Sequence, residues 1–326
     1  LYVGEIFVAH LAVTSPLIVQ TVERVLPLVP AARIRILTGG ALARPILSAA
    51  SMLGRDQLLL EPRARGTAPV LVWAAHTLVA QDPDAVMLSL HADHVIEPAA
   101  ALRDVLARAA ALSREHDRLF TLGAVPTRPE TGYGYIAPGR ALAGEGGGHE
   151  VERFVEKPDR TKAEQYIAAG WLWNTGIFIW PAALLLDEIR RYTPELATLL
   201  PLLDGGDTAA FFDRAPSLSI DEGLLERSRA VGVLRADFEW DDVGAWDAVG
   251  RTRAGDDAGN VAEGDAHFVD ARNNIAWADD GSIVVFGADD LVVVRSGGIT
   301  FVAPRDRTPD LKHLLSQLPD GLVSGE

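Results

Sequence analysis

The chain has 326 residues, of which 48% are hydrophobic, a formal net charge of −15 and no cysteine. A chain of this length and apolarity can bury a large core, as one big α/β domain or as two domains. The negative charge disfavours nucleic-acid and anionic-membrane partners, which need clustered lysine and arginine. The lack of cysteine excludes disulfides, thiolate metal sites and cysteine nucleophiles. We find no signal peptide or membrane span and expect a cytoplasmic protein.

The first 62 residues predict alternating strands and helices. Strands are expected over residues 1–12, 34–38 and 57–62, where short apolar runs end at glycine, proline or charge. Helices are expected between Pro16 and Pro27, and over residues 43–53. This β-α-β-α-β order is typical of a doubly wound parallel sheet.

A basic segment separates the third strand from the next helix. Arg63, Arg65 and Gly66 precede a helix predicted over residues 70–81, with Thr67 as its N-cap and Pro69 in its first turn. Positive charge beside a helix N-terminus suits an anion or a nucleotide. A solvated loop with an ordinary N-cap explains the segment equally well.

The apolar run from Ala85 to Leu90 stops abruptly at His91, Asp93 and His94. Such a run predicts a buried strand, and ligands of α/β sheets bind beyond the carboxyl ends of strands. Asp93 is therefore a candidate ligand for a metal or a phosphate, although turn or cap aspartates are common. A transition-metal trio is disfavoured, because on a strand His94 would point away from the other two.

The middle of the chain carries two polar segments beside predicted strands. Tyr133 and Gly134 follow a strand over residues 119–126, and glycine there lets the backbone approach a ligand. A strand over residues 150–155 delivers Glu156 and Lys157, and lysine is a natural partner of a phosphate monoester.

Further along, Asn174 begins a buried strand, where its amide either meets a sugar hydroxyl or serves a turn. Asp241 and Asp242 are adjacent acids between two tryptophans. A divalent cation would offset their repulsion, although paired acids are also common at exposed turns.

The residues after Trp246 predict short strands separated by glycine-rich or aspartate-rich turns. Their spacing of eight or nine residues suggests a small β-helix-like domain, closed by a helix around residues 311–318. We expect a structural cap or a dimer surface there. The domains would be 1–250 and 251–326. The five strands are expected over 265–270, 274–278, 282–286, 291–295 and 299–303.

Seven short motifs, taken together and in order, resemble the mannose-1-phosphate guanylyltransferase family. They are Glu61-Pro62 with Gly66-Thr67-Ala68-Pro69, Ala92-Asp93-His94, Thr131-Gly132-Tyr133-Gly134-Tyr135-Ile136, Phe154-Val155-Glu156-Lys157-Pro158, Trp173-Asn174-Thr175-Gly176-Ile177-Phe178, Ser219-Ile220-Asp221 and Trp240-Asp241-Asp242-Val243-Gly244. The resemblance implies an α/β fold: a Rossmann-like (GT-A-like) nucleotidyltransferase domain with a mixed, mostly parallel sheet, plus the small C-terminal β-rich domain.

The resemblance also implies a reaction, in which GTP and mannose 1-phosphate give GDP-mannose and pyrophosphate. In-line attack of the sugar phosphate on the α-phosphorus would need Mg²⁺, and a homodimer is compatible with the family. The implied roles are Mg²⁺ ligands for Asp93 and Asp242, sugar-phosphate binding for Lys157, mannose binding for Gly134, Glu156 and Asn174, substrate binding for Tyr133, and guanine contact for Gly66, Thr67, Ala68 and Pro69.

The N-terminus departs from the family, whose members carry there a Gly-Gly-x-Gly-Thr-Arg loop that cradles nucleotide phosphates. The matching stretch, Val8 to Pro16, has no glycine, and no lysine or arginine occurs before Glu23. Either a loop is omitted from the sequence and its flanks are joined, or the protein is a diverged relative. The second case keeps an alternative open, namely a non-catalytic sugar-nucleotide-binding or regulatory protein.

Overall fold

The computed structural model describes residues 17–144, 146–243, 246–310 and 317. The strand predicted over residues 1–12 lies outside these ranges, as does most of the helix around 311–318. The described chain divides into two compact units. The larger comprises residues 21–92 and 96–240, and the smaller takes in 93–95 and the part from 241 onward.

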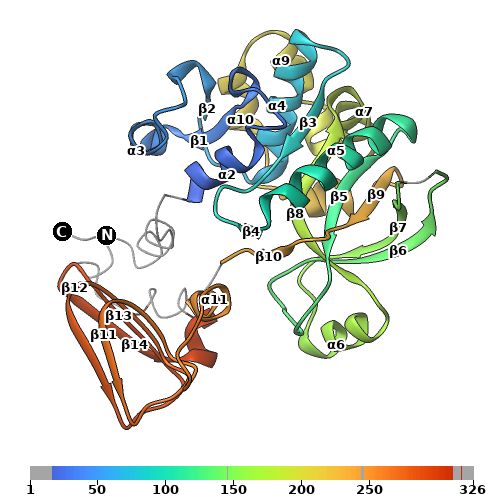
Figure 1. Ribbon diagram of the computed structural model, residues 1–326. Coiled ribbons are helices and arrows are strands. Elements are labelled where there is room, and N and C mark those ends of the chain that lie inside the picture. The colour runs from blue at the N-terminus through green and yellow to red at the C-terminus, as the bar shows by residue number, and fades with distance from the viewer. Residues whose placement is uncertain (1–16, 145, 244–245, 311–316, 318–326) are drawn as a thin grey trace. The chain divides into compact units, whose positions relative to one another are not determined.

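The larger unit is built on a six-stranded sheet in the order β3-β8-β5-β9-β7-β6 (Figure 1). Only β5 and β9 pair in parallel within it, and every other pairing is antiparallel. The mixed sheet is as expected, whereas the mostly parallel pairing is wrong for the described strands. The strands are β3 (Val86–Ser89), β5 (Leu119–Ala124), β6 (Tyr135–Ala141), β7 (His149–Val155), β8 (Leu172–Pro181) and β9 (Val231–Arg235).

The reason for this difference is that an apolar run reports burial, not the direction of neighbouring strands. All six residues of β5 are buried. A strand covered on both faces gives the same unbroken pattern beside parallel or antiparallel partners. A separate parallel pair, β1 (Ile36–Gly39) with β2 (Leu58–Glu61), confirms two of the predicted strands.

Helices cover this sheet, and their apolar faces form its core. Helices α4 (Thr67–Gln81) and α7 (Ala182–Tyr192) share one large cluster with β8, in which Trp180 is fully buried. Helix α5 (Ala99–Glu115) buries Leu102, Val105, Leu106 and Ala109, which recur at helical spacing. The other described helices are α2 (Leu17–Val25), α3 (Ala43–Ala49), α6 (Arg160–Ala168), α8 (Pro194–Ala197), α9 (Leu200–Asp204), α10 (Thr208–Arg214) and α11 (Asp247–Thr252). No helix in the described ranges is long and apolar enough to cross a membrane.

The smaller unit stacks strands in parallel, as the β-helix-like prediction requires. Strand β11 (Val261–Val269) pairs in parallel with β12 (Ile275–Phe286), which pairs in parallel with β13 (Leu291–Ser296). Strand β14 (Ile299–Pro304) then returns antiparallel to β13. The two strands predicted over 274–278 and 282–286 are one continuous strand, β12.

Two buried asparagines connect successive turns of this coil. Asn260 and Asn274 are 3% and 0% exposed. The Asn274 amide donates to Asn260 Oδ1 (3.1 Å) and to the Ala288 carbonyl (2.9 Å), while its oxygen accepts from the Leu291 N–H (2.9 Å). These bonds satisfy polar groups that burial would otherwise penalise, so Asn274 has a structural role.

Candidate functional site

Three residues expected to meet a sugar come together where β6, β7 and β8 lie side by side. Gly134 precedes β6, and a Cβ atom built on it would lie 2.7 Å from Glu156 Oε2. The Asn174 N–H donates to the Gly134 carbonyl at 2.8 Å. Only glycine therefore lets the Glu156 carboxylate lie against this backbone.

Lys157 lies at the edge of the same cluster. Its Nζ is 3.1 Å from Glu156 Oε1, and 63% of its side chain is exposed. Its backbone has φ of 46°, a conformation that non-glycine residues adopt at a cost, and its N–H donates to the Tyr133 carbonyl (3.2 Å). Burial raises the pKa of Glu156, although the hydrogen bond from Lys157 opposes that rise. A cation and a partly desolvated carboxylate thus meet at an accessible surface.

Tyr133, which precedes Gly134, is buried among aromatic side chains. Its ring packs edge-on against Trp173 (5.2 Å between centroids) and against Trp240 (5.1 Å), and the residue is 9% exposed. The Arg128 guanidinium donates to its hydroxyl at 3.3 Å. The ring supports the loop before β6, and a substrate contact by Tyr133 stays a prediction.

Asp221 also belongs to this cluster, although the sequence motif that contains it predicts no role for its side chain. The Asn174 Nδ2 donates to Asp221 Oδ1 at 2.9 Å. Burial, followed by the nearby Glu156 carboxylate, raises the pKa of Asp221 to about 7. An aspartate at the start of a helical segment is typical of an N-cap, so no pattern in the sequence indicates this contact.

The segment around Gly66 is engaged by the protein itself. Gly66 has φ of +82° and is the N-cap of α4 in place of the predicted Thr67, whose hydroxyl accepts from the Ile220 N–H (2.8 Å). Arg65 donates to the Phe212 carbonyl (2.9 Å), and Arg63 pairs with Asp213 (3.1 Å).

The remaining residues of this turn are covered as well. Ala68 is fully buried and Pro69 is buried at the first turn of α4, as predicted for the proline. Arg65 is thus held by backbone carbonyls, whereas Arg63 is in an exposed and weak ion pair, and anion binding by this segment stays a prediction. The guanine contact of Gly66, Thr67, Ala68 and Pro69 stays a prediction.

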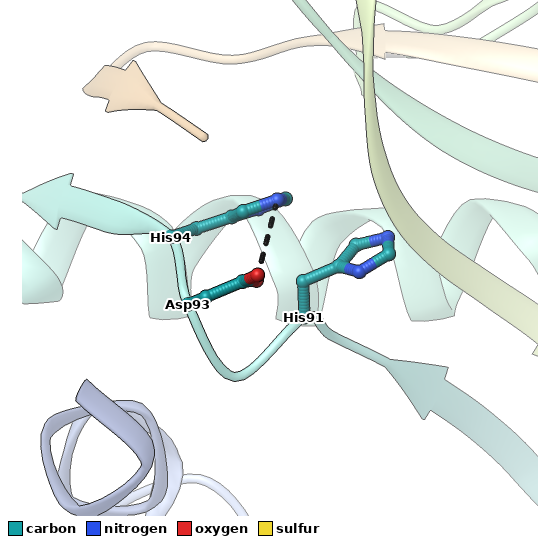
Figure 2. A group of neighbouring side chains, drawn as sticks. All are labelled: His91, Asp93 and His94. Atoms are coloured by element: carbon teal, nitrogen blue, oxygen red, sulfur yellow. Dashed lines mark ion pairs between the residues drawn. The ribbon is translucent and has the colours of Figure 1, made fainter. Parts of the chain in front are cut away.

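His91, Asp93 and His94 lie in the loop after β3, and their ligand atoms all fall within 4.8 Å of one another. Figure 2 shows the Asp93 and His94 side chains extending together from the loop, with His94 Nε2 4.0 Å from Asp93 Oδ1. The expectation that His94 points away is wrong, because β3 ends at Ser89 and strand alternation no longer applies. Imidazole and carboxylate together can hold a divalent metal.

The adjacent aspartates 241 and 242 have different surroundings. Asp241 ends strand β10 (Glu239–Asp241), and its carboxylate accepts from Arg251 Nε (2.7 Å), Arg251 Nη2 (3.0 Å) and the Val243 N–H (2.9 Å). Strand β10 pairs with β4 (Val95–Glu97) in a small sheet of its own. Asp242 follows β10 directly and is half-buried. Asp241 is thus a structural anion, and Asp242 keeps its place as the candidate metal ligand.

Comparison with known families decides the classification. Residues 14–257 match the model described as nucleotidyl transferase. The chain belongs to the nucleotidyl transferase family. Residues 264–318 match a second model, described as a MannoseP isomerase/GMP-like beta-helix domain. Members of the first family generally use divalent metal ions.

Individual proteins resemble the chain over most of its length. A putative mannose-1-phosphate guanylyltransferase of Vibrio cholerae is 34% identical over 274 residues, which are 81% of this chain and 58% of that protein. The alginate biosynthesis protein AlgA of Pseudomonas aeruginosa is 36% identical over 279 residues, covering 82% and 58%. The chain thus spans about 58% of the length of these curated relatives.

A solved structure covers nearly the whole chain. The structure described as mannose-1-phosphate geranyltransferase from Thermus thermophilus superimposes with a TM-score of 0.84 at 33% identity. The match covers 93% of this chain and 89% of that one. The combination of a nucleotidyltransferase domain with a β-helix-like domain is therefore confirmed.

Proposed function

We propose that this protein transfers GMP from GTP to mannose 1-phosphate, forming GDP-mannose and pyrophosphate. The observation that carries the proposal is the assembly of Gly134, Glu156, Lys157 and Asn174 at one edge of the sheet, in a chain about 34% identical to a putative mannose-1-phosphate guanylyltransferase. A cation beside hydrogen-bonding groups suits a phosphorylated sugar. A cytoplasmic location and a homodimer belong to the same proposal.

The chemistry asks for positioning and charge neutralisation more than for a protein base. A phosphate oxygen of mannose 1-phosphate forms a bond to the α-phosphorus of GTP, and the bond from that phosphorus to pyrophosphate breaks. The attacking oxygen is already an anion at neutral pH. Lys157 would neutralise the sugar phosphate, while Glu156 and the Asn174 amide would hold mannose hydroxyls.

We further propose that Asp93 and Asp242 hold Mg²⁺. Both are carboxylates, the donor type that Mg²⁺ prefers, and neither is fully buried. Bound there, the ion would neutralise phosphate charge. Because His91 and His94 lie close to Asp93, a softer ion such as Mn²⁺ is a further candidate.

A second candidate function rests on the N-terminal stretch Val8 to Pro16, which lacks the glycines and cations of a phosphate loop. Under this alternative the protein binds GDP-mannose without turnover.

The test measures pyrophosphate release from GTP and mannose 1-phosphate, with Mg²⁺ or Mn²⁺. Asp93→Ala and Asp242→Ala should each abolish turnover, while Asp187→Ala, an exposed carboxylate paired with Arg190, should leave it unchanged. Wild-type protein that binds GDP-mannose but releases no pyrophosphate would refute the transferase and favour the binding protein.

A further inference from the structure

The Asn174 amide is held at both ends by other side chains. Its oxygen accepts from the Thr121 hydroxyl at 2.8 Å and from the Gly176 N–H at 3.3 Å. Its nitrogen donates one hydrogen bond to Asp221 Oδ1 at 2.9 Å. The backbone donor at Gly176 fixes which end is oxygen, because a flipped amide would set N–H against N–H. Among the residues that the structure describes, the second N–H of Asn174 has no acceptor, so it can donate to a ligand.

Thr121 and Asp221, the two side chains that hold the Asn174 amide, differ in whether they can ionise. Thr121 is fully buried on β5 and cannot ionise. Asp221 begins the helical segment Asp221–Leu225, whose Leu224 and Leu225 are buried in the main core. The Asp221 backbone is therefore held by the core, and the Asp221 carboxyl is the partner of Asn174 whose charge can change.

We propose that Asp221 is a positioning residue of the sugar site, which holds the Asn174 amide and takes up a proton from solvent when an anionic sugar phosphate binds beside Lys157. This inference rests on the proposed function, since it takes Asn174 and Lys157 as ligand-binding residues. The inference adds Asp221, whose charge determines how tightly the site binds the sugar phosphate.

The charges around Asp221 support this coupling. Asp221 lies near the carboxyls of Glu156 and Glu226, and Glu222 is a further acid that acts on Glu156. The Glu226 Oε1 accepts from the Glu156 N–H at 3.2 Å. Lys157 is the cation that acts on Asp221, and it also lies 3.1 Å from Glu156 Oε1. Negative charge thus outweighs positive charge near Asp221.

The helices packed against Asp221–Leu225 do not change this excess of negative charge near Asp221. Helix α4 presents apolar residues, and Glu188 of α7 is bonded to Arg191 (3.1 Å) and to Ser228 (2.6 Å). A ligand phosphate at Lys157 would engage the cation that stabilises the Asp221 anion. The free energy of ionising Asp221 then increases, so the bound state holds the proton more tightly.

The test compares Asp221→Asn and Asp221→Ala with the wild type. Asparagine keeps an acceptor oxygen for the Asn174 amide but cannot ionise, whereas alanine removes both the acceptor oxygen and the ionisable group. The KM for mannose 1-phosphate is measured between about pH 7 and 8.5, above the second pKa of about 6 of a phosphate monoester. Asp187→Asn, an exposed carboxylate paired with Arg190, is the matched control.

In wild type, the KM for the sugar phosphate should rise with pH, by up to about tenfold per unit. Asp221→Asn should remove this rise while keeping the low KM. Asp221→Ala should raise the KM about tenfold or more at every pH, with kcat and the KM for GTP changed less than about threefold. An Asp221→Asn enzyme with the wild-type pH profile, or an Asp221→Ala enzyme with an unchanged KM, would overturn the inference.

A ligand-free readout separates this inference from the proposed function. The NMR signals of the Asn174 side-chain amide, assigned with Asn174→Asp, should shift with a midpoint near the Asp221 pKa of about 7 and stay constant in Asp221→Asn. Absence of wild-type turnover together with this titration would refute the proposed function but support the control of Asn174 by Asp221. An amide that does not titrate would refute that control whatever the activity.

Discussion

Replacing Asp241 by alanine should destabilise the smaller unit much more than the same change at Asp242. The Asp241 carboxylate accepts two hydrogen bonds from Arg251 and one from the Val243 N–H. Removing one partner of a buried ion pair costs about 3 to 5 kcal/mol. The Arg251 side chain is 25% exposed and can recover part of its hydration, so we expect a loss of about 2 to 3 kcal/mol.

Urea unfolding followed by tryptophan fluorescence measures this loss. Trp246 and Trp277 are 1% and 3% exposed and pack with Val243 in the core of the smaller unit, so the emission of a variant that keeps only these two of the seven tryptophans reports its unfolding. Asp242→Ala is the matched control, and we expect a smaller loss because Asp242 is only half-buried, whereas Asp241 is 8% exposed. The double variant Asp241→Ala/Arg251→Ala should lose about 1 to 2 kcal/mol less than the sum of the single losses. Equal losses for the two aspartates, or additive single losses, would refute this reasoning.

Three further predictions concern backbone conformation and pH. Gly66→Ala should cost about 2 kcal/mol or more in urea unfolding, because φ is +82° and the new Cβ would lie 2.5 Å from the Leu218 carbonyl oxygen; a smaller loss would mean that the turn relaxes. Gly176→Ala should displace the His91 ring, since the Cβ would lie 2.6 Å from Nε2, and an unchanged His91 NMR signal would contradict this. The Asp221 pKa is raised from 3.8 to about 7 by folding, so this group favours the folded state below pH 3.8 and that contribution is lost as pH rises towards 7, with an upper bound of about 4 kcal/mol. Asp221→Asn should accordingly be more stable than wild type at about pH 8, and equal urea midpoints there would count against the shift.

The sequence predicted several elements, and the closeness of Gly134, Glu156 and Asn174, from local preferences; that these three residues bind a sugar stays a prediction. Helix α5 follows from apolar residues at helical spacing, and α6 begins after an aspartate N-cap, Asp159, which accepts from the Lys162 N–H at 2.8 Å. Gly134 precedes β6, Glu156 follows β7 and Asn174 lies in β8. Strand β6 pairs with both β7 and β8. Short motifs with strong local preferences therefore carried this part of the prediction.

The missed features depend on contacts distant in sequence or on loop conformation. Asn174 and Asp221 are bonded across 47 positions, and no periodicity records such a pair. The direction of β8 beside β3 is set by the path of the chain and not by the apolar run. His94 turns towards Asp93 because the strand has already ended, which depends on backbone angles that composition does not specify.

The paired asparagines of the C-terminal coil have a consequence for how that coil unfolds. Asn260 accepts from Asn274, and Asn274 in turn accepts from the Leu291 N–H. Loss of Asn260 would leave the next amide with a donor unsatisfied, and the defect would pass to the following turn. Turns linked in this way gain and lose order together with their neighbours, as in repeat proteins. We therefore expect the coil to accept insertion or deletion of whole turns, but not of a single residue between Asn260 and Asn274.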